Sequence, residues 1–279
     1  MIQNCITWLV SAFFPCILGA AELVEVKNFA YRAEGAAGDG ITEFCKLDLY
    51  YPAEGADLPC LLWFHGGGLT AGSKDESAAT ARTLARHGFL VASVNYRLSP
   101  QAKYPAYIDD AAAAFAWVSQ HAGEHGGGKA KIFVAGHSAG GYLALMLGND
   151  KRWLGKYGHK PADLAGVISL SGQMVTHFTI RAERGMGNTT IVVDEDAPLL
   201  YAGQACGPQL ILYAEQDMAM RAEENILYLA ARKEAGQTQV RGWMVKDHNH
   251  SSIGENISAE GDPVLKAMVG FIRETVAHR

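Results

Sequence analysis

The chain has 279 residues, 49% of them apolar, and a net charge of −5 at pH 7. This length and apolar content suffice for one large domain with a well-buried core, and an α/β domain of this size commonly stays undivided. The acidic charge balance leaves no basic face for phosphate groups. It argues against nucleic acid and anionic membrane surfaces as partners and favours a small neutral or mildly polar substrate.

The first 21 residues differ in character from the rest of the chain. Residues 6–18 are nearly all apolar, and the small residues 19–21 that follow resemble a signal-peptidase site. The apolar run is too short to span a bilayer, so we expect a signal peptide, a single domain over 22–279, a secreted or periplasmic protein, and no stable membrane insertion beyond the leader. No Lys or Arg precedes Lys27, which leaves a mis-assigned start or a buried first helix, and then a cytoplasmic protein, as alternatives.

Strand patterns and helix patterns then alternate along the chain. Two segments of alternating polar and apolar residues, separated by a Gly-rich turn, predict an antiparallel hairpin at Leu23–Arg32 and Glu43–Tyr51. Apolar runs, typical of buried strands, lie at Cys60–Phe64, Phe89–Val94, Ile132–Ala135, Leu164–Leu170 and Gln209–Ala214, and Val240–Val245 is predicted to be the last strand. Helical patterns lie at Ser77–His87, Ile108–His121, after Gly140, and at Pro263–His278.

Strands separated by helices predict an α/β fold with a mostly parallel central sheet and helices on both of its faces. The segment 171–207 interrupts the alternation, because it is long and mixed in composition and lies between two strands. We expect it to form a lid over the site or irregular structure of its own.

A candidate nucleophile lies between one of these strands and its helix. The apolar strand ends at Ala135, and Gly136-His137-Ser138-Ala139-Gly140 leads into a helix-forming run. This is the strand, tight turn and helix context of a G-x-S-x-G nucleophile elbow, in which small residues flank a strained serine. Ser138 is therefore the predicted nucleophile.

A serine hydroxyl is a weak nucleophile at neutral pH, so a base and an orienting carboxylate are needed further along the chain. Asp217 ends a predicted strand, where the carboxyl edge of a parallel sheet presents it to a crevice, and Glu215 is its competitor. The base is expected in the loop after the last strand. His250 is favoured there by its loop position and by the residues that follow it, with His248 as the alternative.

The sequence predicts neither a metal nor an organic cofactor. A metal role for His248 and His250 needs a third ligand that the sequence does not supply. The cysteines beyond the leader, Cys45, Cys60 and Cys206, form neither a CxxC pattern nor an even set, so we expect free thiols.

The glycine run after the predicted strand Cys60–Phe64 suits an oxyanion hole. Glycines let the backbone approach a reacting group closely and adopt torsions that side chains forbid. Gly67 and Gly68 are therefore expected to turn their N–H groups toward the site, where the N–H of Ala139 joins them. His65 is expected to support this loop through hydrogen bonds.

Other residues have weaker signals. Asp110 and Arg97 are predicted to form a buried ion pair with a structural role. A substrate pocket is predicted from Met174, His177, Phe178 and Arg181, and ordinary packing of the lid is almost as good an interpretation.

Four motifs together resemble the α/β-hydrolase fold, and specifically the hormone-sensitive-lipase-like serine esterases. They are FHGGGLTAGSK (64–74), NYRLSP (95–100), YPAYIDDAAAAFAWV (104–118) and GHSAGGYLA (136–144). HSSIGE (250–255) is also similar to kynurenine formamidases and the related bacterial feruloyl-esterase-like group, whereas many lipase-like members carry an aromatic residue soon after the catalytic histidine.

The resemblance implies a catalytic triad of Ser138, Asp217 and His250, and an oxyanion hole from Gly67, Gly68 and Ala139. We expect a serine carboxylic ester hydrolase that acts on small or medium esters through an acyl-enzyme, without a cofactor. The alternatives are an aryl formamidase or other small-amide hydrolase and, in another class, a catalytically silent binding protein on the same fold. The natural substrate and the oligomeric state stay open.

Overall fold

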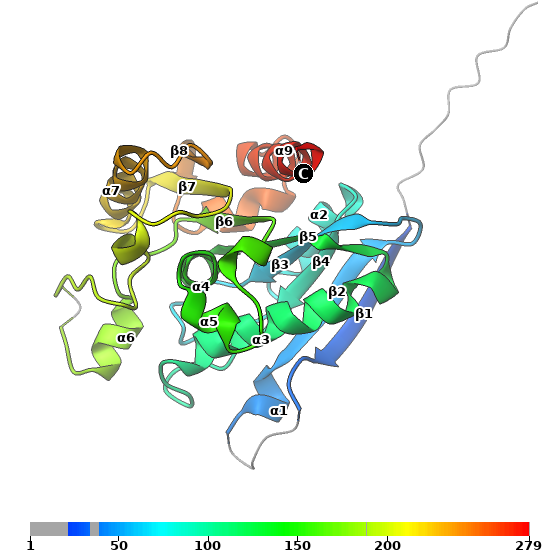
Figure 1. Ribbon diagram of the computed structural model, residues 1–279, viewed down its shortest axis with the longest axis horizontal. Coiled ribbons are helices and arrows are strands. Elements are labelled where there is room, and N and C mark those ends of the chain that lie inside the picture. Colours follow the sequence, from blue (N-terminus) through cyan, green and yellow to red (C-terminus); the bar gives the residue numbers. More distant parts are fainter. Residues whose placement is uncertain (1–21, 34–38, 188, 279) are drawn as a thin grey trace, which may run out of the picture.

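The computed structural model describes residues 22–33, 39–187 and 189–278, and these form one eight-stranded sheet between two layers of helices (Figure 1). The predicted signal peptide lies outside the described residues. The strands are β1 (Leu23–Ala30), β2 (Lys46–Pro52), β3 (Leu58–Phe64), β4 (Leu90–Val94), β5 (Gly127–His137), β6 (Gly166–Leu170), β7 (Gln209–Gln216) and β8 (Val240–Asn249). Their order across the sheet is β1-β2-β4-β3-β5-β6-β7-β8.

The predicted α/β class with a mostly parallel sheet is confirmed. β1 and β2 are antiparallel to each other, and β2 is antiparallel to β4, whereas all other neighbouring strands are parallel. The predicted hairpin is therefore present, but residues Ile41–Phe44 form the short helix α1, so its second strand begins at Lys46 and not at Glu43. β8 is longer than predicted and runs to Asn249.

Helices cover both faces of the sheet (Figure 1). α3 (Ala106–His121), α4 (Ala139–Asn149) and α7 (Arg221–Glu234) pack on one face, and α2 (Ala78–Arg86) and α9 (Pro263–Ala277) pack on the other. The remaining helices are α5 (Lys151–Gly155), α6 (Phe178–Glu183), α8 (Ser252–Glu255), η1 (Ala122–His125), η2 (Pro161–Asp163), η3 (Pro198–Tyr201) and η4 (Asn256–Ser258). Among the helices that the structure describes, none combines the length and the apolar character needed to cross a bilayer.

The two cores follow from the two-residue period of the strands. In β3, Leu62 and Phe64 point into the core beneath α3 and α4, while Leu61 and Trp63 point into the core beneath α2 and α9. Since both faces are covered, the central strands are apolar without interruption, and this is the pattern by which they were predicted.

The carboxyl ends of the parallel strands meet at one edge of the sheet. The residues that the sequence predicts at or beside an active site lie at this edge. His65 follows β3, Ser138 follows β5, Asp217 follows β7 and His250 follows β8. Open parallel sheets commonly bind ligands at this edge. The topology thus brings together residues up to 185 positions apart in the sequence (65 to 250).

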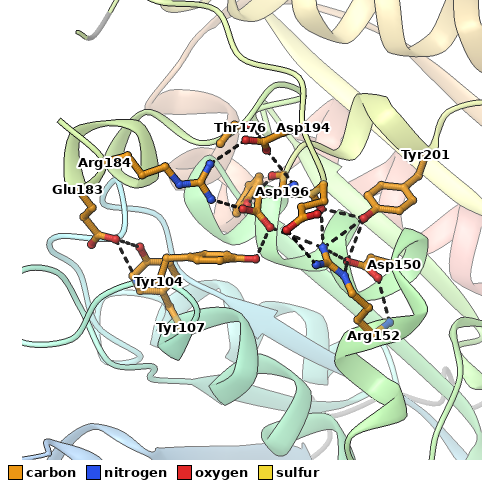
Figure 2. A network of polar contacts seen from close by, with 12 residues as sticks. Tyr104, Tyr107, Asp150, Arg152, Thr176, Glu183, Arg184, Asp194, Asp196 and Tyr201 are labelled. Carbon is orange, nitrogen blue, oxygen red and sulfur yellow. Dashed lines mark hydrogen bonds and ion pairs between the residues drawn. The ribbon is translucent and has the colours of Figure 1, made fainter. Parts of the chain in front are cut away.

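The segment 171–207 is fixed to the body of the domain by a polar network (Figure 2). Asp196, whose side chain is 1% exposed, accepts hydrogen bonds from the Tyr104 hydroxyl and the Arg184 guanidinium. Arg184 also pairs with Asp194 at 2.7 Å. Farther along, the Tyr201 hydroxyl donates to Asp150 at 3.1 Å. These contacts hold the second half of the segment against the turn before α3 and against Asp150, between α4 and α5.

Two predictions away from the sheet edge are also confirmed. Arg97 pairs with the fully buried Asp110 through Nε and Nη2, each at 2.8 Å, and Arg32 adds a second guanidinium to the same carboxylate. Asp110, on α3, thereby contacts the residues that follow β1 and the loop after β4. The cysteines 45, 60 and 206 are free thiols, the first two of them buried.

Close packing at the start of α4 depends on two glycines. A Cβ atom placed on Gly140 would lie 1.9 Å from the carbonyl oxygen of Phe64, and one placed on Gly136 would lie 2.4 Å from the carbonyl carbon of Gly140. Real Cβ atoms do not approach backbone atoms so closely. The helix that carries Ser138 therefore approaches β3 only because these positions lack side chains.

We expect Gly140→Ala to destabilise the protein by about 3 kcal/mol or more, because β3 and α4 must move apart to admit the methyl group. The matched control is Gly155→Ala at the end of α5, where no atom lies within 4 Å of the added Cβ, so stability should be kept or slightly raised. Urea unfolding of both variants measures the difference. Equal free energies of unfolding would contradict this account of the packing.

Candidate active site

Ser138 lies at the turn between β5 and α4 in a strained backbone conformation. Its φ of 54° and ψ of −115° are rare for a residue with a side chain. Its N–H donates to the carbonyl of Leu170 at 2.8 Å, and its carbonyl accepts from Tyr142 at 3.0 Å, so both backbone groups are satisfied. The strain points the hydroxyl away from the backbone and toward the sheet edge, as the elbow pattern predicts.

The structure brings Ser138, His250 and Asp217 into one hydrogen-bonded row. His250 Nε2 lies 2.9 Å from Ser138 Oγ, and His250 Nδ1 lies 2.5 Å from Asp217 Oδ1. With Nδ1 protonated, the ring donates to the carboxylate and offers the Nε2 lone pair to the serine hydroxyl. This is the geometry that proton removal from the serine requires.

The carboxylate of Asp217 is held charged by its surroundings. Burial opposes the charge, but hydrogen bonds from His250 and Ser171 outweigh it, so the pKa of Asp217 lies below its ordinary value. Ser171 Oγ donates to Oδ2 at 2.5 Å, and the N–H of Met218 donates to Oδ1 at 2.8 Å. Asp217 is therefore ionised at neutral pH and has a fixed orientation.

The competing residues lie elsewhere. Glu215 is exposed and accepts a hydrogen bond from the backbone N–H of Asp247 at 3.1 Å. His248 belongs to β8 and is buried against Asp262, at 3.5 Å, and Ser252, at 3.3 Å. His250, by contrast, is the first residue after β8, where the chain turns toward Ser138.

The loop after β3 places free N–H donors beside Ser138. Gly67 and Gly68 have φ values of 101° and 65°, which side chains disfavour. Gly67 and Gly68 line the cavity in front of Ser138, and Ala139 is the first residue of α4. In the part of the chain that the structure describes, no hydrogen bond uses the N–H of Gly67, Gly68 or Ala139. Donors left free beside a nucleophile suit a developing oxyanion.

His65 supports this loop as expected and does not reach Ser138. Its Nδ1 donates to the carbonyl of Gly66 at 2.7 Å, and its ring stacks on Tyr96 at 4.3 Å between centroids. The Tyr96 hydroxyl donates to the carbonyl of His65 at 2.8 Å. Burial lowers the pKa of His65 to about 4, so the ring is neutral at pH 7.

A cavity of about 540 Å³ opens in front of Ser138. Of the four predicted pocket residues, only Phe178 lines it. Met174 and His177 are fully buried behind the wall, and Arg181 lines a neighbouring cavity instead. The prediction for Met174 and His177 is therefore wrong, because the segment folds inward at these residues and packs them against the domain.

Two polar partners of the row were not predicted. Ser171, which holds Asp217, follows β6 at φ 50° and so has the same kind of strained turn as Ser138. His137 donates Nε2–H to the carbonyl of His250 at 2.6 Å, and burial lowers its pKa to about 4. The only sequence signal for either is its place at the carboxyl end of a strand.

No group of three or more His, Cys, Asp or Glu side chains within residues 22–33, 39–187 and 189–278 is arranged to hold a metal ion. The polar groups at the sheet edge are already paired with one another, as the contacts of His250 and Asp217 show. The chemistry that the arrangement itself offers is attack by an activated hydroxyl.

The eight-stranded, mostly parallel sheet between two layers of helices is an α/β-hydrolase fold. Residues 47–228, more than half of the chain, match the model of the BD-FAE family, and the chain belongs to that family. The resemblance to serine esterases noted in the motifs is thereby confirmed.

Curated relatives cover part of the chain. Carboxylesterase NlhH of Mycobacterium tuberculosis is 40% identical over 159 residues, which are 51% of this chain and 50% of that protein. Esterase LipI of the same organism is 40% identical over 38% of this chain and 35% of its own length. The chain thus spans about half the length, or less, of the curated relatives it matches.

Solved structures show the same fold over most of the chain. A hyperthermophilic esterase from Pyrobaculum calidifontis has a TM-score of 0.67 at 24% identity and covers 83% of this chain and 81% of its own. A truncated carbohydrate esterase from gut microbiota has a TM-score of 0.72 at 18% identity and covers 92% and 98%. At these identities the likeness concerns the fold alone.

Three buried neutral histidines make stability depend on pH. Burial lowers the pKa of His65 and His137 to about 4 and that of His177 well below 6.5. Because the unfolded chain binds these protons near pH 6.5 and the folded chain does not, their contribution is complete above pH 6.5 and is lost as the pH falls.

We therefore expect the free energy of unfolding to fall between pH 7 and pH 5, on the order of 2 kcal/mol for each of these side chains. Urea titrations at several pH values measure it. A free energy of unfolding that stays constant or rises toward pH 5 would contradict the burial of neutral histidines.

Proposed function

We propose that the protein is a carboxylic ester hydrolase in which Ser138 is the nucleophile, His250 the base, and Asp217 the residue that orients and stabilises the protonated base. The observation that carries the proposal is the unbroken row Asp217–His250–Ser138, with contacts of 2.5 and 2.9 Å. The names of the relatives, carboxylesterase and esterase, support the same reaction class.

In the first half of the reaction Ser138 Oγ attacks the ester carbonyl carbon while His250 Nε2 takes its proton. The carbonyl oxygen becomes an oxyanion and receives hydrogen bonds from the free N–H groups of Gly67, Gly68 and Ala139. One such donor contributes about 3 kcal/mol to stabilising the transition state. His250 then returns the proton to the departing alcohol, and the acyl group stays on Ser138.

In the second half, water replaces the alcohol. His250 takes a proton from the water as it attacks the acyl carbon, and the proton passes to Ser138 Oγ as the acid leaves. The ionised Asp217 stabilises the imidazolium in both halves, which is why its low pKa matters to the reaction. Neither half requires a metal or an organic cofactor.

Ser138→Ala is expected to lower turnover of 4-nitrophenyl acetate by at least about a thousandfold, because the variant lacks the hydroxyl that lies 2.9 Å from His250 Nε2. The same change should abolish labelling by a fluorophosphonate. Initial rates and mass spectrometry of the labelled peptide measure both effects. Ester turnover equal to that of the wild type in the variant would remove Ser138 from the mechanism.

His250→Ala is expected to lower kcat by at least about a thousandfold, whereas His248→Ala, which loses only the contacts with Asp262 and Ser252, should keep activity within about tenfold. Both variants replace a histidine by alanine, at positions two residues apart, so each is the control for the other. The reverse ranking would transfer the role of the base to His248.

A further inference from the structure

A second cavity, of about 290 Å³, adjoins the one in front of Ser138. Phe178 and Met218 line both cavities and so form the boundary between them. The second cavity lies between residues of the segment 171–207 and the first turn of α7. The two cavities therefore meet at Phe178 and Met218.

Two buried guanidinium groups line this second cavity. Arg181, on α6, is 4% exposed and donates Nη1 to the carbonyl of Thr190, while its Nε is buried without a partner. Arg221, the first residue of α7, is 3% exposed and donates Nη1 to the carbonyl of Ser171 at 2.6 Å. Each guanidinium has five N–H donors, so most of them are not used by these bonds.

Among the described residues, neither arginine has a carboxylate within ion-pair distance. Arg184, one turn from Arg181, differs in this respect because it pairs with Asp194 and Asp196. The one acid that lines the cavity, Glu224, is engaged by the N–H of Met174 at 2.9 Å and by Gln173 at 3.4 Å. The cavity wall thus carries a net positive charge in a chain whose net charge is −5.

Buried cations without counterions are costly, and the cost falls when an anion binds. Burial lowers the pKa of Arg221 below its ordinary value, although the charges of Glu224 and Asp217 nearby act in the opposite direction. A carboxylate matches the planar fork of a guanidinium and accepts two parallel hydrogen bonds from it. A neutral group would accept hydrogen bonds from the guanidinium N–H donors but would not compensate the positive charge.

We propose that this cavity is a carboxylate-binding subsite, in which Arg181 and Arg221 receive a free carboxylate carried by the acyl or the alcohol part of the ester. This inference rests on the proposed ester hydrolysis at Ser138. The apolar residues Met218, Met220 and Ile191 also line the cavity and contact the hydrocarbon that links the carboxylate to the ester. The preferred substrates are thus esters that are also acids.

The test compares acid and neutral ester pairs of equal size at low salt. On the alcohol side the pair is 4-acetoxybenzoate and 4-acetoxybenzamide, and on the acyl side it is phenyl hydrogen glutarate and phenyl glutaramate. At least one acid should exceed its amide in kcat/KM by about 10- to 100-fold, with the gain mostly in KM. The pair that shows the preference identifies the part of the ester that enters the cavity.

Arg181→Met should abolish this preference, and Arg181→Lys should restore part of it. Arg273→Met, an exposed arginine on α9, is the matched control and should leave the preference unchanged. Because the ratio of acid to amide is measured within each variant, partial loss of folded protein does not alter it.

Two outcomes would overturn the inference: no preference in either pair, or a preference that survives in Arg181→Met. Turnover of phenyl acetate above that of Ser138→Ala would then still support the proposed function. If no ester is turned over, the proposed function is rejected, but the subsite is not. Calorimetry of ligand binding then tests the subsite separately. Binding of 4-acetoxybenzoate at least about tenfold weaker in Arg181→Met than in the wild type supports it, and equal binding rejects it.

Discussion

The hydrogen bond between Asp217 and His250 is the contact on which the site depends. It joins the loop after β7 to the turn after β8, and the other nitrogen of the same ring reaches Ser138 at the end of β5. Without it the imidazole has neither a fixed tautomer nor a fixed direction. The surrounding contacts serve this bond: Ser171 holds the free oxygen of Asp217, and His137 holds the backbone of His250.

Sequence reasoning succeeded where a local pattern determines the geometry. The strained turn at Ser138 needs glycines on both sides, and the five consecutive residues 136–140 contain this pattern. The parallel sheet follows from uninterrupted apolar runs, which only burial on both faces explains. His250 and Asp217 were predicted as partners of Ser138 because each follows a strand. The structure places both in one hydrogen-bonded row with Ser138, at the edge where the carboxyl ends of the strands meet.

The predictions that failed depend on tertiary contacts, and such contacts leave no periodic pattern in the sequence. Met174 and His177 were expected in the pocket, but the segment after β6 turns inward and buries both, leaving Phe178 as the residue that reaches it. Ser171 was not predicted because a lone serine after a strand has no motif, although its backbone strain resembles that of Ser138. The residues whose placement was not predicted thus lie in the part of the chain where patterns predict least.

The most direct measurement of the central claim is a crystal structure of the protein after reaction with diethyl 4-nitrophenyl phosphate. The account predicts a covalent bond from Ser138 Oγ to phosphorus, with the phosphoryl oxygen within hydrogen-bond distance of the N–H groups of Gly67, Gly68 and Ala139. An unmodified Ser138, or a phosphoryl oxygen that points away from these three donors, would contradict it.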